Sequence, residues 1–423
     1  MFAPLSQGTS SRFFLPETPN RWDWALLPLV LGILAAMAFA AAQADRPFTL
    51  GETLPVSLDP MLLPYYLLRT ILRMFAALFC SLLFSFLFAS VAAKYRFAEK
   101  ILIPLLDILQ SVPILGFQAI TIAPFIALFP GSLLGVECAA VFAIFTSQAW
   151  NMAFSLYQSI RTVPEELREV ASVFRLSGWQ RFWRMELPFA MPGLLWNMMM
   201  SMSGGWFFLV AAEAISVANQ DIKLPGIGSY IAVAIEKENA VAICQAIGAM
   251  LAGILLYDQL FFRPLLAWAD KFRFEETRSG IAQHSWLLSA IRQSSLTRRL
   301  LRGPALLLER SFGWFRRRKT PKPHPKTDMR RSALWRYAGD ALLVLLVGSA
   351  LVGFLLFVHS EVGWQEVARV AALGCITLAR VVALISLASL FWVPVAVWIG
   401  LRPQYSQKVQ ALAQFLAAFP VNL

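Results

Sequence analysis

The sequence predicts an all-α polytopic membrane protein, and two observations support that prediction. The chain of 423 residues is 58% hydrophobic and only 15% charged, whereas a soluble domain carries about 25% charged residues. The charges also leave long gaps, and a helical bilayer crossing needs roughly 20 apolar residues. Eight uncharged runs of about that length occur, at 24–44, 74–93, 108–136, 138–160, 187–212, 240–257, 341–360 and 381–401, and a ninth begins at Val409.

The first run, 24–44, ends in the small-residue stretch AFAAAQAD, which resembles a signal-peptidase site. A signal peptide has an apolar core of about 7–15 residues. This run is longer, and the leader before it contains Glu17 and Asp23. We therefore expect the run to be retained as a transmembrane span.

Basic residues orient the spans, because cytoplasmic loops carry an excess of Lys and Arg. Lys94, Arg96 and Lys100 follow the second run, and five arginines lie between the fourth and fifth runs. Residues 271–336 hold 17 Lys and Arg against 4 Asp and Glu. The sequence therefore predicts six spans, then a basic linker, with the N-terminus and the linker in the cytoplasm. A nucleic-acid arm is the alternative for this linker, but its place between spans favours the orientation signal and contact with lipid headgroups.

A weak internal repeat relates two parts of the chain at an offset of 307 residues. In each part an arginine precedes an uncharged run, a basic turn follows, and an amphipathic stretch ends in proline. The identical pairs are Thr70/Thr377, Arg73/Arg380, Ala76/Ala383, Leu83/Leu390, Phe84/Phe391, Ala89/Ala396, Leu105/Leu412, Leu109/Leu416 and Pro113/Pro420. The repeat predicts a first unit over 1–270, a linker over 271–336 and a partial second unit over 337–423. A complete second unit would need about 150 further residues, so we expect a truncated one.

A charged insert, RTVPEELREVASVFRLSGWQRFWRMELP, occupies residues 161–188 between two uncharged runs. Thr162 and Glu165 fit a capping box with Pro164 in the first turn. An apolar stripe follows at helical spacing, and Ser177-Gly178 is expected to end the helix. The stripe comprises Leu167, Val170, Ala171 and Phe174. The insert is thus a short cytoplasmic helix joined to two spans; a helix that merely anchors the loop at the membrane surface remains the alternative.

These residues carry a family resemblance. PEELREVA, a glycine-containing turn and RFWRMELPFAMPGLL resemble the EAA loop of permease subunits of bacterial binding-protein-dependent ABC importers. SMSGGWFFLVAAEAI and LPGIGSYI are similar to the nitrate/sulfonate/taurine branch. The family's Glu-Ala-Ala falls on Glu169, Val170 and Ala171, so valine replaces the middle alanine. The family's glycine falls on Arg175, and the closing Leu-Pro is kept at 187–188.

The resemblance implies a six-span permease unit followed by the first part of a second one, in a bacterial inner membrane. It implies that the insert couples the chain to an ATP-binding cassette ATPase. The implied coupling residues are Glu165, Glu166, Arg168, Glu169, Ala171, Phe174, Arg175 and Gly178. It also implies a periplasmic or lipoprotein solute-binding protein and a second transmembrane unit, either the missing half or a homodimer partner. The sequence has no GxxxxGK[ST] motif, so we expect no catalysis and no cofactor in this chain.

Polar side chains inside the spans are candidates for the solute pathway, because burying them in a bilayer is costly. They are Asp107, Gln110, Gln148, Asn151, Asn197, Trp206 and Glu213. Interhelical hydrogen bonds are the alternative role for most of them. Gly204-Gly205 either loosens its helix or lets another helix approach closely. Four cysteines and three histidines show no metal-ligand spacing.

The predicted function is ATP-driven import of a small anionic solute of the nitrate, sulfonate, taurine or bicarbonate type. An ion- or proton-coupled secondary transporter is the alternative, with Asp107 or Glu213 as its ion site. A membrane enzyme is disfavoured, because no nucleophile, base or metal constellation faces one side of the bilayer. Arg73 and Arg380 could attract an anion or reach lipid headgroups. Residues 224–230 are expected to form an outer turn that leads into a short helix.

Overall fold

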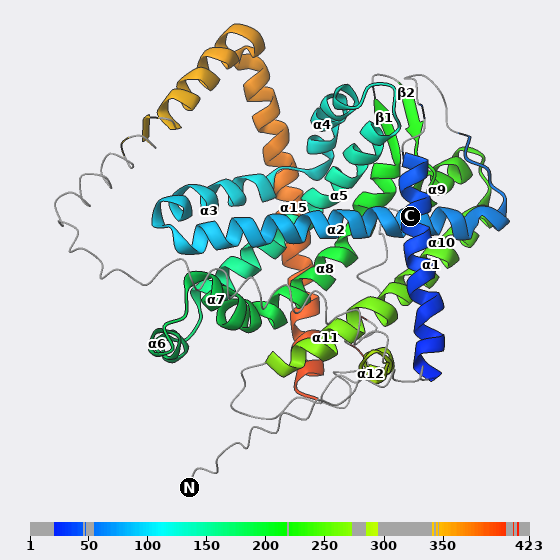
Figure 1. Cartoon of the computed structure of the whole chain (residues 1–423). Coiled ribbons are helices and arrows are strands. Elements are labelled where there is room, and N and C mark those ends of the chain that lie inside the picture. Colours follow the sequence, from blue (N-terminus) through cyan, green and yellow to red (C-terminus); the bar gives the residue numbers. More distant parts are fainter. Residues whose placement is uncertain are drawn as a thin grey trace, which may run out of the picture. The chain divides into compact units, whose positions relative to one another are not determined.

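The computed structural model describes residues 21–44, 47, 55–217, 220–272, 285–294, 341, 344–345, 347–402, 409 and 413. Most of the predicted linker and of the ninth run therefore lie outside the described residues. The helices are α1 (Arg21–Ala44), α2 (Leu63–Lys94), α3 (Arg96–Ser111), α4 (Ile114–Leu128), α5 (Leu134–Arg161), α6 (Glu165–Val173), α7 (Gly178–Arg181), α8 (Leu187–Glu213), α9 (Ile227–Glu236), α10 (Ala240–Tyr257), α11 (Arg263–Ala269), α12 (Trp286–Gln293) and α15 (Trp364–Gly400), with one hairpin of β1 (Ala214–Val217) and β2 (Gln220–Lys223) (Figure 1). The predicted all-α membrane class is confirmed, with this hairpin as a small exception.

Five helices are long and apolar enough to cross a membrane, by length and composition, among the described residues. They are Pro60–Lys94, Leu134–Arg161, Gly178–Glu213, Ala240–Phe272 and Trp364–Gly400. Each contains one of the predicted uncharged runs, except that the run 381–401 extends one residue past the end of the last helix. The helix α1 covers the first run, although only its part Val30–Phe39 qualifies as apolar.

The run 108–136 is not one helix, so the expectation of a single continuous span there is wrong. Ser111 ends α3, and Pro113 precedes α4 with an extended backbone. Proline has no amide hydrogen and pushes the residue before it out of the helical region. A second break follows at Gly131, whose φ is +76°. An uncharged stretch predicts burial in lipid or protein, but proline and glycine decide where the helix stops.

The described residues fall into two compact units. One comprises most of the first 318 residues except 94–105, and the other comprises 94–105 and 319–419. In the first unit α5 packs along α8 and against α4. The close packing uses small residues: a Cβ atom at Gly205 would lie 3.1 Å from Nε2 of Gln148, and one at Gly193 would lie 3.4 Å from Oγ of Ser159. Gly204 and Gly205 do not break α8, and the predicted close approach of another helix occurs at Gly205.

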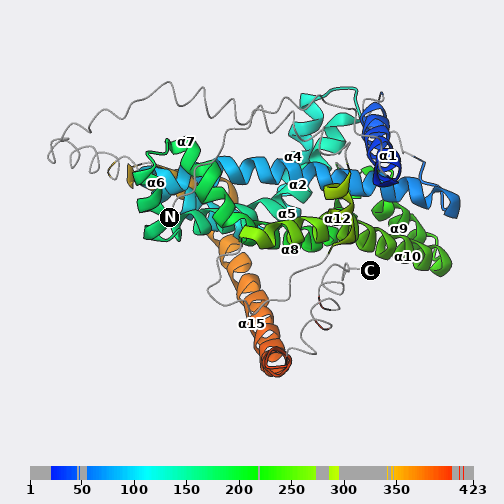
Figure 2. The same ribbon diagram turned by 60° about the horizontal axis from the view of Figure 1, so that its bottom comes forward.

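One helical path runs the length of the first unit. The short α7 continues through a π-helical segment, Phe182–Glu186, into α8, and together they form the single span Gly178–Glu213. At about 1.5 Å per residue this path is roughly 50 Å long. In both ribbon views α6 and α7 lie at one end of it and α9 lies at the other (Figures 1 and 2), and Figure 1 shows β1 and β2 at the same end as α9. The predicted turn and short helix after Leu224 are present as α9.

The second unit is described mainly through α15. This helix has 37 residues and contains no buried residue. The predicted run 381–401 is thus only the second half of a longer helix. A π-helical segment, Val358–Val362, and Gly363 at φ +79° precede it.

Candidate coupling insert and buried ion-pair cluster

The helix α6 of the charged insert begins without the predicted capping box. Thr162 still belongs to the end of α5: its amide and its hydroxyl both donate to the carbonyl of Gln158, each at 3.0 Å. Pro164 is the N-cap residue and makes no side-chain cap. The expectation fails because α5 runs on to Arg161, so the threonine hydroxyl is already committed to the preceding helix.

The end of α6 is a Schellman motif. The amide of Leu176 donates to the carbonyl of Ala171 at 3.0 Å, and that of Arg175 donates to Ser172 at 2.9 Å. The motif requires a left-handed residue, which is usually glycine, and Arg175 occupies it with φ +49°. This is the position on which the family's glycine falls. The expected helix end at Gly178 is wrong, because Gly178 opens α7 instead.

Replacing Arg175 by glycine is expected to stabilise the end of α6 by about 1 kcal/mol, because a residue with a Cβ is strained in the left-handed region. Hydrogen exchange of the α6 amides should slow correspondingly. Arg175→Ala is the matched control, because it removes the same charge and keeps the Cβ. Equal protection in the two variants would contradict this explanation.

A capping box does occur in the insert, at α7. The Ser177 hydroxyl accepts from the amide of Gln180 at 3.3 Å, and the Gln180 side chain accepts from the amide of Ser177 at 3.1 Å. Nε of Arg181, the last residue of α7, donates to Glu186 at the end of the π-helical segment at 2.9 Å. These contacts all lie within the insert, directly before α8 begins at Leu187.

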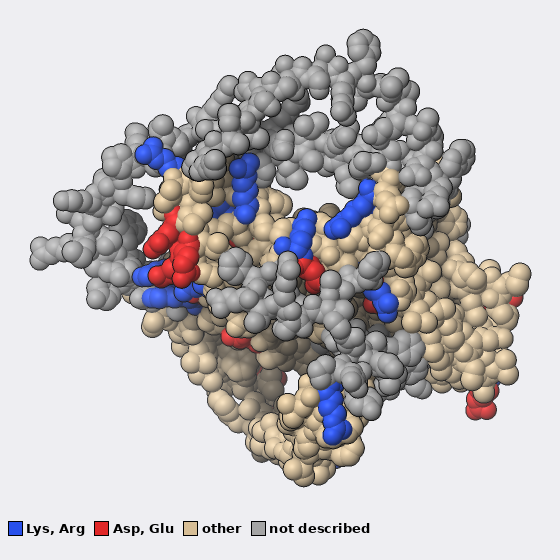
Figure 3. Space-filling model, turned by 90° about the horizontal axis from the view of Figure 1, so that it is seen from below, with Lys and Arg blue, Asp and Glu red and all other residues tan. Residues whose placement is uncertain are grey.

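Most of the implied coupling residues are exposed. Phe174 and Val173 are 72% and 78% exposed, and they lie beside acidic side chains of α6. On the face drawn in Figure 3, acidic side chains gather most densely over α6. Two residues of the set contact the rest of the chain. Ala171 is buried, and Nη2 of Arg168 donates to the carbonyl of Arg161 at 3.0 Å. The exposed ones are Glu165, Glu166, Arg168, Glu169, Phe174, Arg175 and Gly178.

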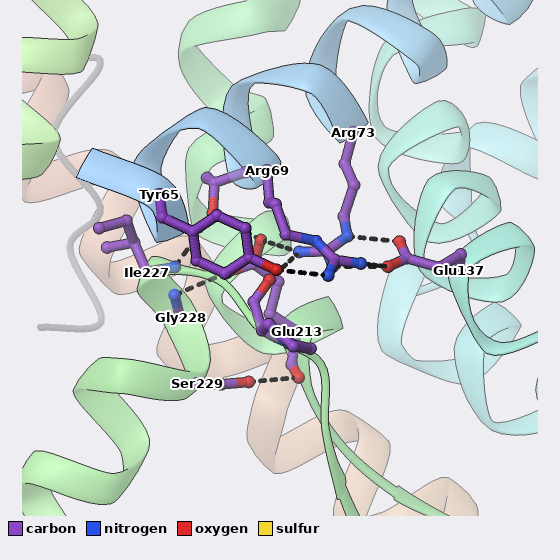
Figure 4. Close-up of polar contacts among 10 residues, drawn as sticks. Tyr65, Arg69, Arg73, Glu137, Glu213, Ile227, Gly228 and Ser229 are labelled. Atoms are coloured by element: carbon purple, nitrogen blue, oxygen red, sulfur yellow. Dashed lines mark hydrogen bonds and ion pairs between the residues drawn. The ribbon is translucent and has the colours of Figure 1, made fainter. Parts of the chain in front are cut away.

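At the other end of the first unit, Arg73 of α2 joins two buried carboxylates. Its Nε and Nη2 donate to the two oxygens of Glu137 at 2.6 and 2.7 Å, and its Nη1 donates to Glu213 at 2.7 Å (Figure 4). Arg69, one turn earlier, donates to Glu137 at 2.5 Å and to the hydroxyl of Tyr65 at 3.0 Å. The two arginines balance the two carboxylates. Arg73 therefore neither attracts a free anion nor reaches lipid headgroups in this structure.

The carboxylate of Glu213 is also held by the start of α9. The Thr70 hydroxyl and the Gly228 amide each donate to it at 2.7 Å. The backbone carbonyl of Glu213 accepts from Ser229 at 2.7 Å. A helix N-terminus favours a negative charge because its first amides lack intrahelical partners. Glu213 is thus a fully satisfied internal anion with 0% exposure.

The cluster and the insert are joined by the same two helices. Glu137 lies in the first turn of α5, and the insert follows the last turn. Glu213 is the last residue of α8, and the insert precedes its first turn. Both helices that flank the insert therefore end, at their far ends, on the guanidinium of Arg73.

The structure brings two of the pathway candidates to the α5–α8 interface. Nε2 of Gln148 donates only weakly, to Sδ of Met202 at 3.8 Å, and its Oε1 has no partner among the described residues. Nδ2 of Asn197 donates to Oγ of Ser155 at 3.0 Å. The contact of Asn197 is therefore an interhelical hydrogen bond, the role given above as the alternative to a place in the solute pathway.

The other pathway candidates lie apart. Asp107 and Gln110 are exposed and bonded to each other at 3.1 Å, and Asn151 is exposed. Trp206 is buried and donates to the hydroxyl of Tyr257 at 3.3 Å. Only Glu213 belongs to the ion-pair cluster.

Sequence reasoning missed Arg69, Thr70 and Glu137 as members of the cluster. Glu137 was treated only as the charge that separates two apolar runs. A signal was present, because arginines at 69 and 73 are one helical turn apart and so share a face. In addition, a single acid among 52 otherwise uncharged residues over 108–160 needs a partner. Among the described residues, no group of three His, Cys, Asp or Glu could hold a metal ion.

Comparison with known proteins identifies the segment that contains these features. Residues 81–261 match the family described as binding-protein-dependent transport system inner membrane component. This segment, 181 of the 423 residues, resembles a permease domain of that family. It contains the insert, Glu137 and Glu213, whereas Arg69 and Arg73 lie just before it. The resemblance read from the EAA-like loop is thereby confirmed.

Curated relatives of the permease domain transport small inorganic anions, according to their names. The nitrate import permease protein NrtB of Synechocystis sp. is 27% identical over 120 residues, which are 28% of this chain and 41% of that protein. NrtB of Leptolyngbya laminosa is 27% identical over 154 residues, 36% and 50% of the two chains. The bicarbonate transport system permease protein CmpB of Synechococcus elongatus is 25% identical over 134 residues, 32% and 45%. The chain thus spans about half the length of the curated relatives it matches.

Proposed function

We propose that this chain is the transmembrane permease component of an ATP-driven importer for a small anion of the nitrate or bicarbonate type. A separate ATP-binding cassette ATPase would bind the insert, and a solute-binding protein would deliver the anion on the opposite side. The observation that supports this proposal is the insert itself. Its two exposed helices, α6 and α7, connect directly to the membrane spans α5 and α8. The chain would cross the bacterial inner membrane with this insert in the cytoplasm, as its five arginines favour.

The exposed surface of α6 suits a protein partner. Val170, Val173 and Phe174 are at least half exposed although they are apolar. Exposed apolar side chains rimmed by charges are typical of interaction sites. A partner groove that covers them would hold the insert by apolar contact, and the glutamates at 165, 166 and 169 would set its orientation.

Movement of the insert would reach the far side of the membrane through α5 and α8. Because α7, the π-helical segment and α8 form one helix, a displacement at Gly178 is carried toward Glu213. Arg73 ties that end to the start of α5. The pair α5–α8 would therefore move as one body relative to its surroundings when the ATPase closes.

The anion would not be bound by Arg69 or Arg73 in the state described here, because both are neutralised by carboxylates. Donors with weak partners are better candidates. Gln148, whose amide meets only a thioether and whose carbonyl oxygen is unpaired among the described residues, is the candidate that we retain at the α5–α8 interface. The same neutralisation argues against Glu213 as the free ion site of a secondary transporter.

The test is co-purification of the ATPase from native membranes with variants of the insert. Glu169→Lys and Phe174→Ser are each expected to reduce the bound ATPase at least about tenfold, since hot-spot substitutions cost about 2 kcal/mol or more. Membrane insertion should be unchanged, because both side chains are exposed. Glu236→Lys is the matched control: an exposed glutamate at the other end of the first unit, whose ion pair with Lys223 contributes at most about 1 kcal/mol.

An ATPase that remains bound in both insert variants would refute the coupling role of α6. Solute uptake by the purified chain alone, driven by an ion gradient, would support the secondary-transporter alternative instead.

A further inference from the structure

Two π-helical segments lie within long helices of the first unit. The segment Phe182–Glu186 joins α7 to α8, and the segment Asp258–Phe262 joins α10 to α11. In each case the amide that follows the segment donates to the carbonyl of the segment's first residue, five positions earlier. A π-helical turn holds one residue more than the α-helical turn that it replaces, and such turns are frequent at functional sites.

An ion pair spans each of these segments at the same spacing. Nε of Arg181 donates to Glu186 at 2.9 Å, and Nε of Arg263 donates to Asp258 at 3.2 Å. Residues five apart on an α-helix point about 140° away from each other, because each residue turns the helix by about 100°. Charged pairs on an α-helix therefore use spacings of three or four residues. Both ion pairs thus depend on the π-helical turn between their partners.

The second segment is also fixed by aromatic packing against α8. The ring centroids of Tyr257 and Phe262, again five residues apart, lie 5.7 Å from each other. The hydroxyl of Tyr257 accepts from Trp206 of α8 at 3.3 Å, and α11 packs against α8. A change of turn in the second segment would break these contacts. The first segment lies directly after the insert, so a change of turn there would move the insert.

The π-helical turn at Phe182–Glu186 determines how the insert is oriented on α8. If this segment became α-helical, its extra residue would rotate α7 by about 100° about the helix axis and move it by about 1.5 Å along the axis. The other end of the insert is attached to α5, because Arg168 of α6 donates to the carbonyl of Arg161 at 3.0 Å. The π-helical turn therefore sets the orientation of α7 relative to this second attachment.

We propose that Arg181 and Glu186 are positioning residues of the insert: their ion pair holds the π-helical turn and so sets which side of the insert faces its partner. Neither residue belongs to the coupling set that the family resemblance implies. Glu186 is buried, so it acts on a partner through the shape of the helix. This inference rests on the proposed coupling function and adds to it the residues that orient the insert.

The test moves the carboxylate by one position along the chain. In the double variant Met185→Glu, Glu186→Met the carboxylate lies four residues after Arg181, which is a spacing that an α-helix favours. The composition is unchanged, and the buried position receives an apolar side chain. Arg181→Lys is the matched control, because it keeps a positive charge at the π-helical spacing.

The first measurement is the distance between spin-labelled amino acids at positions Gln158 and Gly178, by pulsed electron paramagnetic resonance of the purified full chain in lipid nanodiscs. Both positions are exposed, and a Cβ added at Gly178 would meet nothing within 4 Å. In the double variant we expect the mean distance to shift by about 3 Å, because a turn of about 100° on a cylinder of radius about 2.3 Å moves a Cα atom by about that much. In Arg181→Lys the distance should stay the same.

The second measurement is the amount of ATPase that co-purifies from native membranes. The double variant should bind at least about tenfold less ATPase, although Glu169 and Phe174 are intact. An unchanged distance in the double variant would overturn the proposal, and so would a shifted distance with fully retained ATPase. If no ATPase co-purifies with the unaltered chain, the coupling function itself fails, and the distance alone decides whether the ion pair holds the turn.

Glu186→Gln covers the case in which the double variant fails to insert. It keeps the size of the side chain and a hydrogen-bonding group but removes the charge. Part of the population should then show the shifted distance. A single population at the original distance would contradict the role of the ion pair.

Discussion

Replacing Arg73 by methionine is expected to lower the free energy of unfolding of the first unit by about 3–5 kcal/mol. The physical reason is that the substitution leaves two buried carboxylates, Glu137 and Glu213, without their shared cation, and an uncompensated buried charge costs about that much. The measurement is the thermal unfolding midpoint of the purified protein in a fixed detergent. Uptake should be lost together with stability, because the far ends of α5 and α8 are no longer tied to each other.

Two further variants separate this explanation from a general packing defect. Arg69→Met should cost less, because Glu137 keeps its forked contact with Arg73. The triple variant Arg73→Met, Glu137→Gln, Glu213→Gln should recover much of the loss, since it removes the unpaired charges and keeps similar volumes. Equal midpoints for Arg73→Met and the triple variant would contradict the electrostatic origin.

Adding one methyl group at the start of α9 is expected to have the second largest effect. A Cβ at Gly226 would lie 2.3 Å from the carboxylate of Glu213, and a Cβ at Gly228 would lie 2.8 Å from the backbone of Val210. Neither neighbour can retreat easily, because the carboxylate is held by several donors and the other contact is main chain. Gly226→Ala and Gly228→Ala should each destabilise the unit by about 1–3 kcal/mol or more, read as a lower unfolding midpoint.

Gly204→Ala is the matched control for these two substitutions. An added Cβ there would meet nothing within 4 Å, and alanine has a higher helix propensity than glycine by about 1 kcal/mol. Its midpoint should stay the same or rise. A decrease as large as that of Gly228→Ala would show that the loss does not come from the close approach at α9.

The spans could be predicted because lipid-buried helices exclude charge, and a gap between charges is visible in one dimension. Five of the eight runs fall in helices long enough to span a membrane for that reason. The exposed helix α6 was also predictable, since its apolar stripe has helical period. The limit of this logic is visible at 108–136, where hydropathy is continuous but Pro113 divides the segment into two helices.

The sequence showed charged residues that need partners, but the pairing within the ion-pair cluster could not be predicted, because its members come from three distant parts of the chain. Arg73 and Glu213 are 140 residues apart in sequence, and nothing local links them. The prediction of a capping box at Thr162 failed for a different reason. Thr162 has the right residue type for an N-cap, but the choice between ending one helix and starting the next depends on tertiary geometry. The left-handed backbone conformation at Arg175 could not be predicted either, since arginine rarely adopts it.

The unbroken helix from Gly178 to Glu213 also fixes the rotational position of Glu213 about the helix axis relative to the insert. Each residue along it turns the side chains by about 100° and advances them by about 1.5 Å. Inserting or deleting one residue in its interior would swing Glu213 away from Arg73 while the insert kept its place. The π-helical segment at Phe182–Glu186 is the one part of this path with a different pitch, and it lies next to the insert. Any adjustment of rotational phase between the two ends is therefore confined to the first turns of the helix, before it reaches the α5 interface.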